Sequence, residues 1–232
     1  MAANTDKRLS EALDWLKRNG ARKTRDGMAG YGITAEKAFG VTMGDMKKLG
    51  KQLGRDHALA DGLWKSGWYE ARMLTAFVDE PEKVTAQQMD RWCREFDNWS
   101  VCDTVCFHLF DRTPHALKMV DKWAKAKGEF QKRAAFALLA CVALHDKQMP
   151  DKPFIDRLPL IEQGSTDERN FVKKAVVWAL RSIGERSPAL NKQCVALAGK
   201  LAATDDATAR WIGKDALKGL TSPAAKKRLA KK

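Results

Sequence analysis

Residues 130–144 read FQKRAAFALLACVAL, and this stretch indicates the class of fold. It opens with an aromatic residue followed three positions later by a cation, and residues 134–144 are all apolar. Eleven apolar residues in succession suit a helix in the protein but fall short of the roughly 20 that cross a membrane. We therefore expect a helix over residues 130–144 and no membrane partner.

Apolar residues recur at helical spacing along most of the chain, and no run alternates with a period of two. Further helices are expected around residues 9–16 and 73–77, and over 89–96, 101–110, 117–123, 171–183, 194–201 and 211–220. Five prolines fall between these stretches, where a missing amide proton does least harm: Pro81, Pro114, Pro150, Pro153 and Pro188. Pro159 is expected to start a second short helix after Phe154. The predicted fold class is all-α.

The aromatic-x-x-cation pattern at the start of this stretch recurs along the chain. It reads YEAR at 69–72, FQKR at 130–133, FVKK at 171–174 and WIGK at 211–214, and WSVC at 99–102 has a cysteine in the cation's place. The fourth positions lie roughly 30 to 40 residues apart, which leaves room for two helices and two turns, as in HEAT-like repeats. We expect one domain over 1–232, a curved α-solenoid with a concave basic groove, an N-terminal helix and loop within 1–30 and a basic tail over 223–232.

Composition points to a polyanionic partner. The 232 residues carry 42 Lys and Arg against 29 Asp and Glu, a net charge of +13, and the sequence pI is about 9.6. The five cysteines are an odd number without CxxC spacing, and the first residues lack an apolar signal segment. Both features favour a reducing cytoplasm over a secreted, disulfide-linked protein.

The sequence lacks the motifs of several common classes of enzyme and metal-binding protein. The chain has no GxSxG, HExxH, Walker loop or paired CxxC, and its glycine-rich residues 20–40 read as a long connection without a GxGxxG fingerprint. Cys102 and Cys106 stand four apart with His108 close behind, but two thiols and one imidazole on one helix favour core packing over a metal site. We expect no metal and no cofactor.

The cations of the repeated pattern say more about a possible ligand than the cysteines and His108 do. In stacked repeats, equivalent residues lie along one face, so Arg72, Arg133, Lys174 and Lys214 can form a row of positive charge that suits a phosphate backbone. The alternative is ordinary ion pairing, since Glu129 lies four residues before Arg133. Phosphate binding is the interpretation we follow.

Two tryptophans lie beside charged residues at helical spacing. Lys174, Trp178 and Arg181 fall on one side of a helix, although the cation stems could simply pack against the indole. Trp99 and Asp103, at i and i+4, point an indole and a carboxylate in the same direction. Asp103 lies among apolar residues, where a local pairing is the alternative to a functional role.

An aspartate and two indoles on a basic surface suit one reaction well. Purines alkylated at N3 or N7 carry positive charge, so the base is already a good leaving group. Breaking the glycosidic bond places positive charge on the sugar, where a carboxylate near C1′ stabilises it and positions the attacking water. Indole faces attract positive charge, and cations hold the flanking phosphates.

Four stretches resemble the AlkD-type DNA alkylation-repair glycosylases, a family built from HEAT-like repeats. They are FGV at 39–41 followed by MKKL at 46–49, DNWSVCD at 97–103, EFQKRAA at 129–135 and FVKKAVVWALR at 171–181. The similarity extends from about residue 31 to 220. The resemblance implies a monofunctional glycosylase that excises cationic N3- and N7-alkylpurines from duplex DNA without base flipping, as a cytoplasmic, nucleoid-associated monomer.

The resemblance also assigns roles to particular residues. It implies that Asp103 is the catalytic carboxylate, that Trp99 and Trp178 contact the lesion's sugar, and that Arg133 and Arg181 contact the DNA backbone. One departure is visible, because Ser100 stands where family members often have an acidic residue.

Two other functions stay open at this point. A repeat protein of this kind can bind distorted or branched DNA without catalysis, and a concave basic face can also serve as a scaffold for an acidic protein. The presence of Asp103 together with both tryptophans favours the enzyme.

Overall fold

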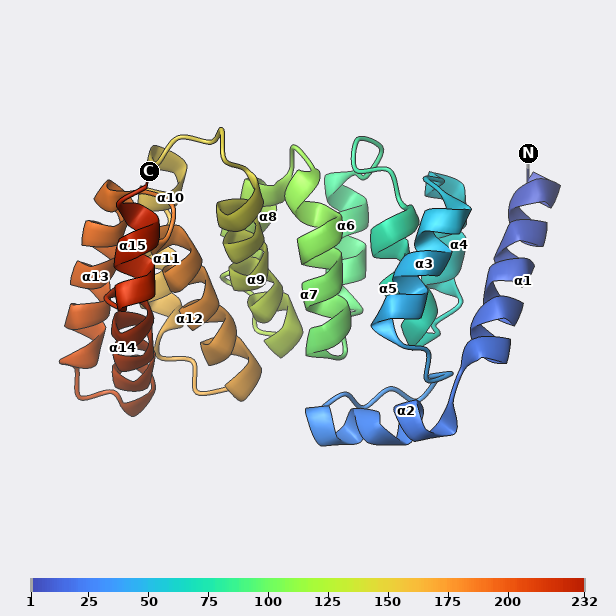
Figure 1. The fold of residues 1–232 in the computed structure, drawn as a ribbon, viewed down its shortest axis with the longest axis horizontal. Coiled ribbons are helices and arrows are strands. Elements are labelled where there is room, and N and C mark those ends of the chain that lie inside the picture. The colour runs from blue at the N-terminus through green and yellow to red at the C-terminus, as the bar shows by residue number, and fades with distance from the viewer. Residues whose placement is uncertain (1, 232) are drawn as a thin grey trace. The chain divides into compact units, whose positions relative to one another are not determined.

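The computed structural model describes residues 2–231, and all regular secondary structure in this part of the chain is helical (Figure 1). The all-α prediction is confirmed. The helices form two compact units, the first extending to Pro114 and the second beginning at His115, and each is described by itself.

The first unit holds the helices α1 to α7 and two 3₁₀ turns. In chain order these are α1 (Ala2–Asn19), α2 (Arg22–Gly27), η1 (Met28–Tyr31), α3 (Met43–Leu53), α4 (His57–Lys65), α5 (Tyr69–Val78), α6 (Ala86–Arg94), α7 (Trp99–His108) and η2 (Phe110–Arg112). Four of these helices begin at a side-chain cap, in which a hydroxyl, amide or carboxylate oxygen accepts a hydrogen bond from the first turn: Thr42, Asp56, Thr85 and Asn98.

Aromatic side chains make up much of the core of the first unit. The rings of Trp64 and Trp92 stack with their centroids 4.3 Å apart, and Phe96 meets Trp64 edge-on at 5.9 Å. Both indoles are fully buried. Burial of such large rings contributes strongly to the stability of this unit.

The second unit holds the helices α8 to α15. They are α8 (Ala116–Trp123), α9 (Glu129–His145), α10 (Lys152–Ile155), α11 (Leu158–Gly164), α12 (Asn170–Gly184), α13 (Pro188–Ala202), α14 (Ala207–Leu220) and α15 (Pro223–Leu229). Helix α9 contains the apolar stretch 134–144, and residues 133–143 are all buried. It packs against α8 and α12. Gly164 lets α11 pack closely against Phe136 of α9, because a Cβ atom on residue 164 would lie 2.4 Å from the Phe136 ring.

The repeated aromatic-x-x-cation pattern lies at the start of most helices that carry it, although Trp211 is only the fifth residue of α14. Tyr69 and Trp99 are the first residues of α5 and α7, and Phe171 is the second of α12. In the second unit, the ring of Phe130 on α9 lies 5.4 Å from that of Phe171, and the guanidinium of Arg133 lies 5.9 Å from the same Phe171 ring. Part of the repeat is therefore a packing motif between successive helices.

The glycine-rich segment 20–40 differs from the long connection that the sequence predicts. It contains α2 and η1, and only the residues after Gly32 run without regular structure to the start of α3. The fully buried Glu70 accepts hydrogen bonds from the amides of Phe39, Gly40 and Val41, at 2.9, 2.6 and 3.2 Å. Gly40 adopts a φ of 86°, which favours glycine. One carboxylate thus holds the end of this segment.

Helix boundaries differ from the predictions at other places too. Pro153 and Pro188 lie within the first turns of α10 and α13, not between helices, because the first turn needs no amide donor. Pro159 lies in the first turn of the short helix α11, as predicted. The basic tail contains the helix α15, which buries Ala225. Among residues 2–231, no helix combines the length and apolar character that a bilayer crossing requires.

Candidate functional site

Helix α7 presents Trp99 and Asp103 on its less buried side. Its other residues up to Cys106 are buried, whereas Trp99, Asp103 and Phe107 keep intermediate exposure at i, i+4 and i+8. The helix begins where the Asn98 side chain accepts a hydrogen bond from the Val101 amide at 3.0 Å. The indole and the carboxylate therefore lie one turn apart at the surface of the first unit, outside its apolar interior.

The Trp99 ring is held by a contact that the sequence does not indicate. Its indole N–H donates to the Tyr31 carbonyl oxygen at 2.9 Å, across 68 residues of chain. Tyr31 ends η1, and the residue is 75% exposed. The N-terminal segment therefore orients one candidate site residue through the backbone of η1. No local motif signals this contact, because it depends on how η1 folds back onto α7.

Ser100, the departure from the family pattern, faces the core. Its hydroxyl lies 2.8 Å from the Tyr69 hydroxyl, and both residues are buried. Burial raises the pKa of Tyr69, so that its hydroxyl stays protonated. A carboxylate in place of Ser100 would be desolvated here, and the serine instead joins α5 to α7 by a neutral hydrogen bond.

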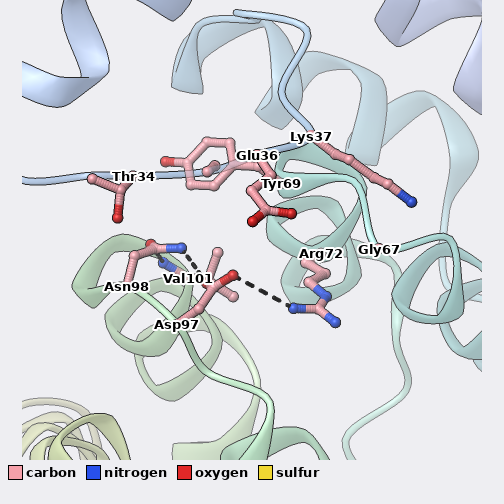
Figure 2. A pocket seen from close by; sticks show the side chains of 10 residues that line it. Thr34, Glu36, Lys37, Gly67, Tyr69, Arg72, Asp97, Asn98 and Val101 are labelled. Atoms are coloured by element: carbon pink, nitrogen blue, oxygen red, sulfur yellow. Dashed lines mark hydrogen bonds and ion pairs between the residues drawn. The ribbon is translucent and has the colours of Figure 1, made fainter.

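Arg72 lies in a pocket of about 360 Å³ in the first unit. Figure 2 shows this pocket with residues 34–37 along one side and Asp97 and Asn98, at the start of α7, along another. The Arg72 guanidinium donates to Glu95 at 3.0 Å, lies 4.0 Å from the Asp97 carboxylate and packs over the Trp64 ring at 5.0 Å. A DNA phosphate would have to compete with Glu95 and Asp97 for the Arg72 guanidinium. The DNA contact of Arg72 stays a prediction.

Arg133 is similarly engaged within the second unit. The residue is only 7% exposed, and its guanidinium donates to the Phe171 carbonyl oxygen at 2.6 Å. This bond joins α9 to the start of α12. A contact with the DNA backbone stays a prediction, and the small exposed part of the side chain would have to make it.

Lys174, Trp178 and Arg181 line one pocket of about 400 Å³ in the second unit. Lys174 and Arg181 are exposed and Trp178 is half-buried, all on the outer side of α12. Arg181 also lies 3.5 Å from Asp215 on α14. The structure therefore brings together one candidate indole and two candidate cations. Lys214 is exposed on α14 and does not line this pocket.

The start of α12 is fixed by charged groups. Asp167 accepts two hydrogen bonds from the Arg169 guanidinium, at 2.8 and 2.6 Å, and lies 3.1 Å from the Lys132 ammonium on α9. These cations lower the pKa of Asp167 to about 2. Arg169 also donates to the Lys127 carbonyl oxygen, so the loop before α9 is tied to the loop before α12.

Positive charge is concentrated in the second unit. From residue 115 onward the sequence has 24 Lys and Arg against 12 Asp and Glu, whereas residues 1–114 have 18 against 17. Nearly all of the net charge of +13 therefore belongs to one unit. This asymmetry makes the second unit the stronger attractor for a polyanion.

The cysteines are core residues. Cys102 and Cys106 are fully buried, as are the other three cysteines, and the core-packing prediction is confirmed. Within residues 2–231, no group of three His, Cys, Asp or Glu side chains is placed to hold a metal ion.

Comparison with known proteins identifies the class and then the family. A solved structure described as a new family of proteins related to the HEAT-like repeat DNA glycosylases with affinity for branched DNA structures has a similar fold, with a TM-score of 0.79 at 18% identity over 95% of each chain. The fold is therefore that of the HEAT-like repeat proteins. The chain belongs to the DNA alkylation repair enzyme family, whose model matches residues 12–220. A search of curated protein sequences finds no match.

Proposed function

We propose that the protein is a monofunctional DNA glycosylase that hydrolyses the N-glycosidic bond of purines alkylated at N3 or N7 in duplex DNA. The observation that carries this proposal is the pairing of Trp99 and Asp103 one turn apart on the less buried side of α7 in a member of a DNA alkylation repair family. The charge of the second unit supports a DNA partner.

The proposed mechanism uses a carboxylate and no cofactor. As the bond between C1′ and the alkylated purine breaks, the electron pair leaves with the base and cancels its positive charge, while positive charge develops on the sugar. The Asp103 carboxylate stabilises that charge and orients the water that attacks C1′. The attacking water loses a proton to solvent as its oxygen bonds to C1′, and the products are an abasic site and a neutral free base.

The remaining site residues have proposed roles in DNA binding. Trp99 and Trp178 contact the DNA around the lesion through their indole faces, which attract a cationic nucleoside. Lys174, Arg181 and Lys214 contact backbone phosphates, with Arg72 and Arg133 as further contacts. In this mode the base stays in the duplex, and the protein acts as a monomer on DNA in the cytoplasm and nucleoid.

The change Asp103→Asn tests the proposal. It keeps the shape of the side chain but removes the negative charge, so release of 7-methylguanine or 3-methyladenine from methylated duplex should fall by about a hundredfold or more. Affinity for the same duplex should stay nearly unchanged. The control is Asp14→Asn, which removes the charge of an exposed carboxylate on α1 and should leave the rate of release intact.

A second candidate function is non-catalytic recognition of branched DNA. The described affinity of the structurally similar protein for branched DNA favours it. If the wild-type protein and Asp103→Asn release base at the same background rate and both bind a four-way junction more tightly than a linear duplex, this second function replaces the first.

A further inference from the structure

Helix α14 exposes a tryptophan in line with two lysines. The residues at positions 207, 211, 214 and 218 are exposed, which at i, i+4, i+7 and i+11 forms one stripe along the helix. Trp211 is 41% exposed, and among residues 2–231 only Tyr31 is a comparably exposed large hydrophobic residue. A single exposed indole is common on a folded surface, but an indole in line with exposed lysines offers both an aromatic face and cations for a ligand.

Helix α12 adds a further cation beside this stripe. The two helices pack together in the second unit (Figure 1). The Lys173 ammonium lies 5.2 Å from the centroid of the Trp211 ring. Further along both helices, Arg181 reaches Asp215 at 3.5 Å. Lys173, Trp211, Lys214 and Lys218 together are called the α14 face below.

We propose that the α14 face binds unpaired nucleotides of single-stranded DNA. A base stacks on the exposed indole of Trp211, and the lysines bind the phosphates on either side of it. Stacking on an aromatic ring flanked by cations is the way in which proteins bind single strands without sequence preference. The proposal depends on the DNA-binding part of the proposed function and not on excision, because no residue of the α14 face takes part in catalysis.

Trp211 and the spacing of the lysines favour a single strand over a duplex or an acidic peptide. Bases within a duplex are already stacked on their neighbours, so an exposed indole gains little from them, whereas an unpaired base offers a free aromatic face. An acidic peptide would satisfy the lysines but has no comparable use for Trp211. Lys218 lies seven residues after Trp211, a rise of about 10 Å along the helix. Lys214 and Lys218 can therefore bind successive phosphates of a single strand whose base stacks on Trp211.

The experiment compares a ten-residue oligothymidylate with a blunt undamaged duplex by fluorescence anisotropy. Trp211→Ala should weaken binding of the oligothymidylate by about tenfold, which is within the range for loss of one stacked base, and should leave duplex affinity unchanged. Trp211→Phe should restore most of the single-strand affinity. Equal binding of the oligothymidylate by the wild type and Trp211→Ala overturns the proposal.

Charge variants test the phosphate contacts independently of Trp211. Lys214→Gln should lower the dependence of oligothymidylate binding on salt, whereas Lys192→Gln, which removes an exposed lysine from α13, should not. Oligoglutamate at matched charge should fail to displace the oligothymidylate. Displacement by oligoglutamate as effective as that by unlabelled oligothymidylate would mean an acidic protein partner and would overturn the proposal.

The outcome can be separated from that of the glycosylase proposal. Asp103→Asn should bind the oligothymidylate like the wild type, and Trp211→Ala should still release alkylated bases from blunt duplex. Loss of excision in Asp103→Asn thus reports on α7, and loss of single-strand affinity in Trp211→Ala reports on the α14 face.

Discussion

At the scale of single residues, neighbours on one helix have different tasks. Trp99 and Asp103 lie on the less buried side of α7, whereas Ser100, between them in sequence, points into the core and is hydrogen-bonded to Tyr69. A helix turns by about 100° per residue, so adjacent positions meet different environments. The absence of an acidic residue at position 100 therefore leaves the Trp99–Asp103 pair intact.

The Asp167 carboxylate predicts a pH dependence of stability. Its pKa is about 2 in the folded protein against an ordinary 3.8, so its stabilising effect is full above about pH 4 and is lost as the pH falls toward 2. This shift corresponds to about 2 kcal/mol of stability at pH 7. Urea unfolding should show Asp167→Asn less stable by about that amount at pH 7 and by about half as much at pH 3.

An exposed ion pair supplies the control for this prediction. Asp156 pairs with Lys152 at 2.8 Å, but both side chains are at least half exposed, so Asp156→Asn should change stability by less than about 0.5 kcal/mol at either pH. A difference between the wild type and Asp167→Asn that stays constant from pH 7 to pH 3 would contradict the assignment to this carboxylate.

At the scale of elements, the position of the candidate site depends on how α7 begins. The buried Asn98 side chain caps the helix directly before Trp99. Removing the cap lets the first turn fray, and the first turn carries Trp99 and leads into Asp103. The element, and not the residue alone, sets the direction in which both side chains point.

Two cap variants separate stability from positioning. Asn98→Ala and Thr85→Ala each remove a cap, from α7 and α6 respectively, and each should lower the free energy of unfolding by about 1 kcal/mol. At a temperature where both variants are fully folded, base release should fall several-fold in Asn98→Ala and stay at the wild-type rate in Thr85→Ala. Equal rates in the two variants would show that α7 does not position the reacting groups.

At the scale of the whole molecule, charge is distributed unevenly between the units. The second unit has twice as many basic as acidic residues, and the first is nearly balanced. Attraction of a polyanion depends on local excess charge, so most of the salt-dependent affinity should come from the second unit.

Salt titrations of duplex binding check this expectation. Replacing Lys174, Arg181 and Lys214 together by Gln should reduce the slope of log K against log salt by about 0.9 for each phosphate contact that is lost. Replacing Lys17, Lys47 and Lys51, three exposed lysines of the first unit, should change the slope by less than about one. A larger effect from the first-unit variant would contradict the assignment of the electrostatic surface.

Much of the fold and part of the candidate site could be predicted from local spacing. The period of apolar residues predicted most of the helices. The i, i+4 and i+7 intervals placed Trp99 with Asp103 and Trp178 with Lys174 and Arg181, because residues at these intervals share a helix face whatever surrounds them. The family stretches could also be read directly. These features depend on chain geometry within one element.

Contacts between elements were decided only by the tertiary structure. The bond from Trp99 to the Tyr31 carbonyl, the burial of Arg133 against Phe171 and the exposure of Trp211 depend on which helices meet and at what distance. Helices α2, α3, α4 and α15 were missed. Helices α2 and α15 are short and gain their stability from neighbouring segments more than from their own periodicity. Helices α3 and α4 contain glycines, which weaken the helical signal of the sequence. Sequence spacing specifies the face of a helix, but only packing specifies what that face meets.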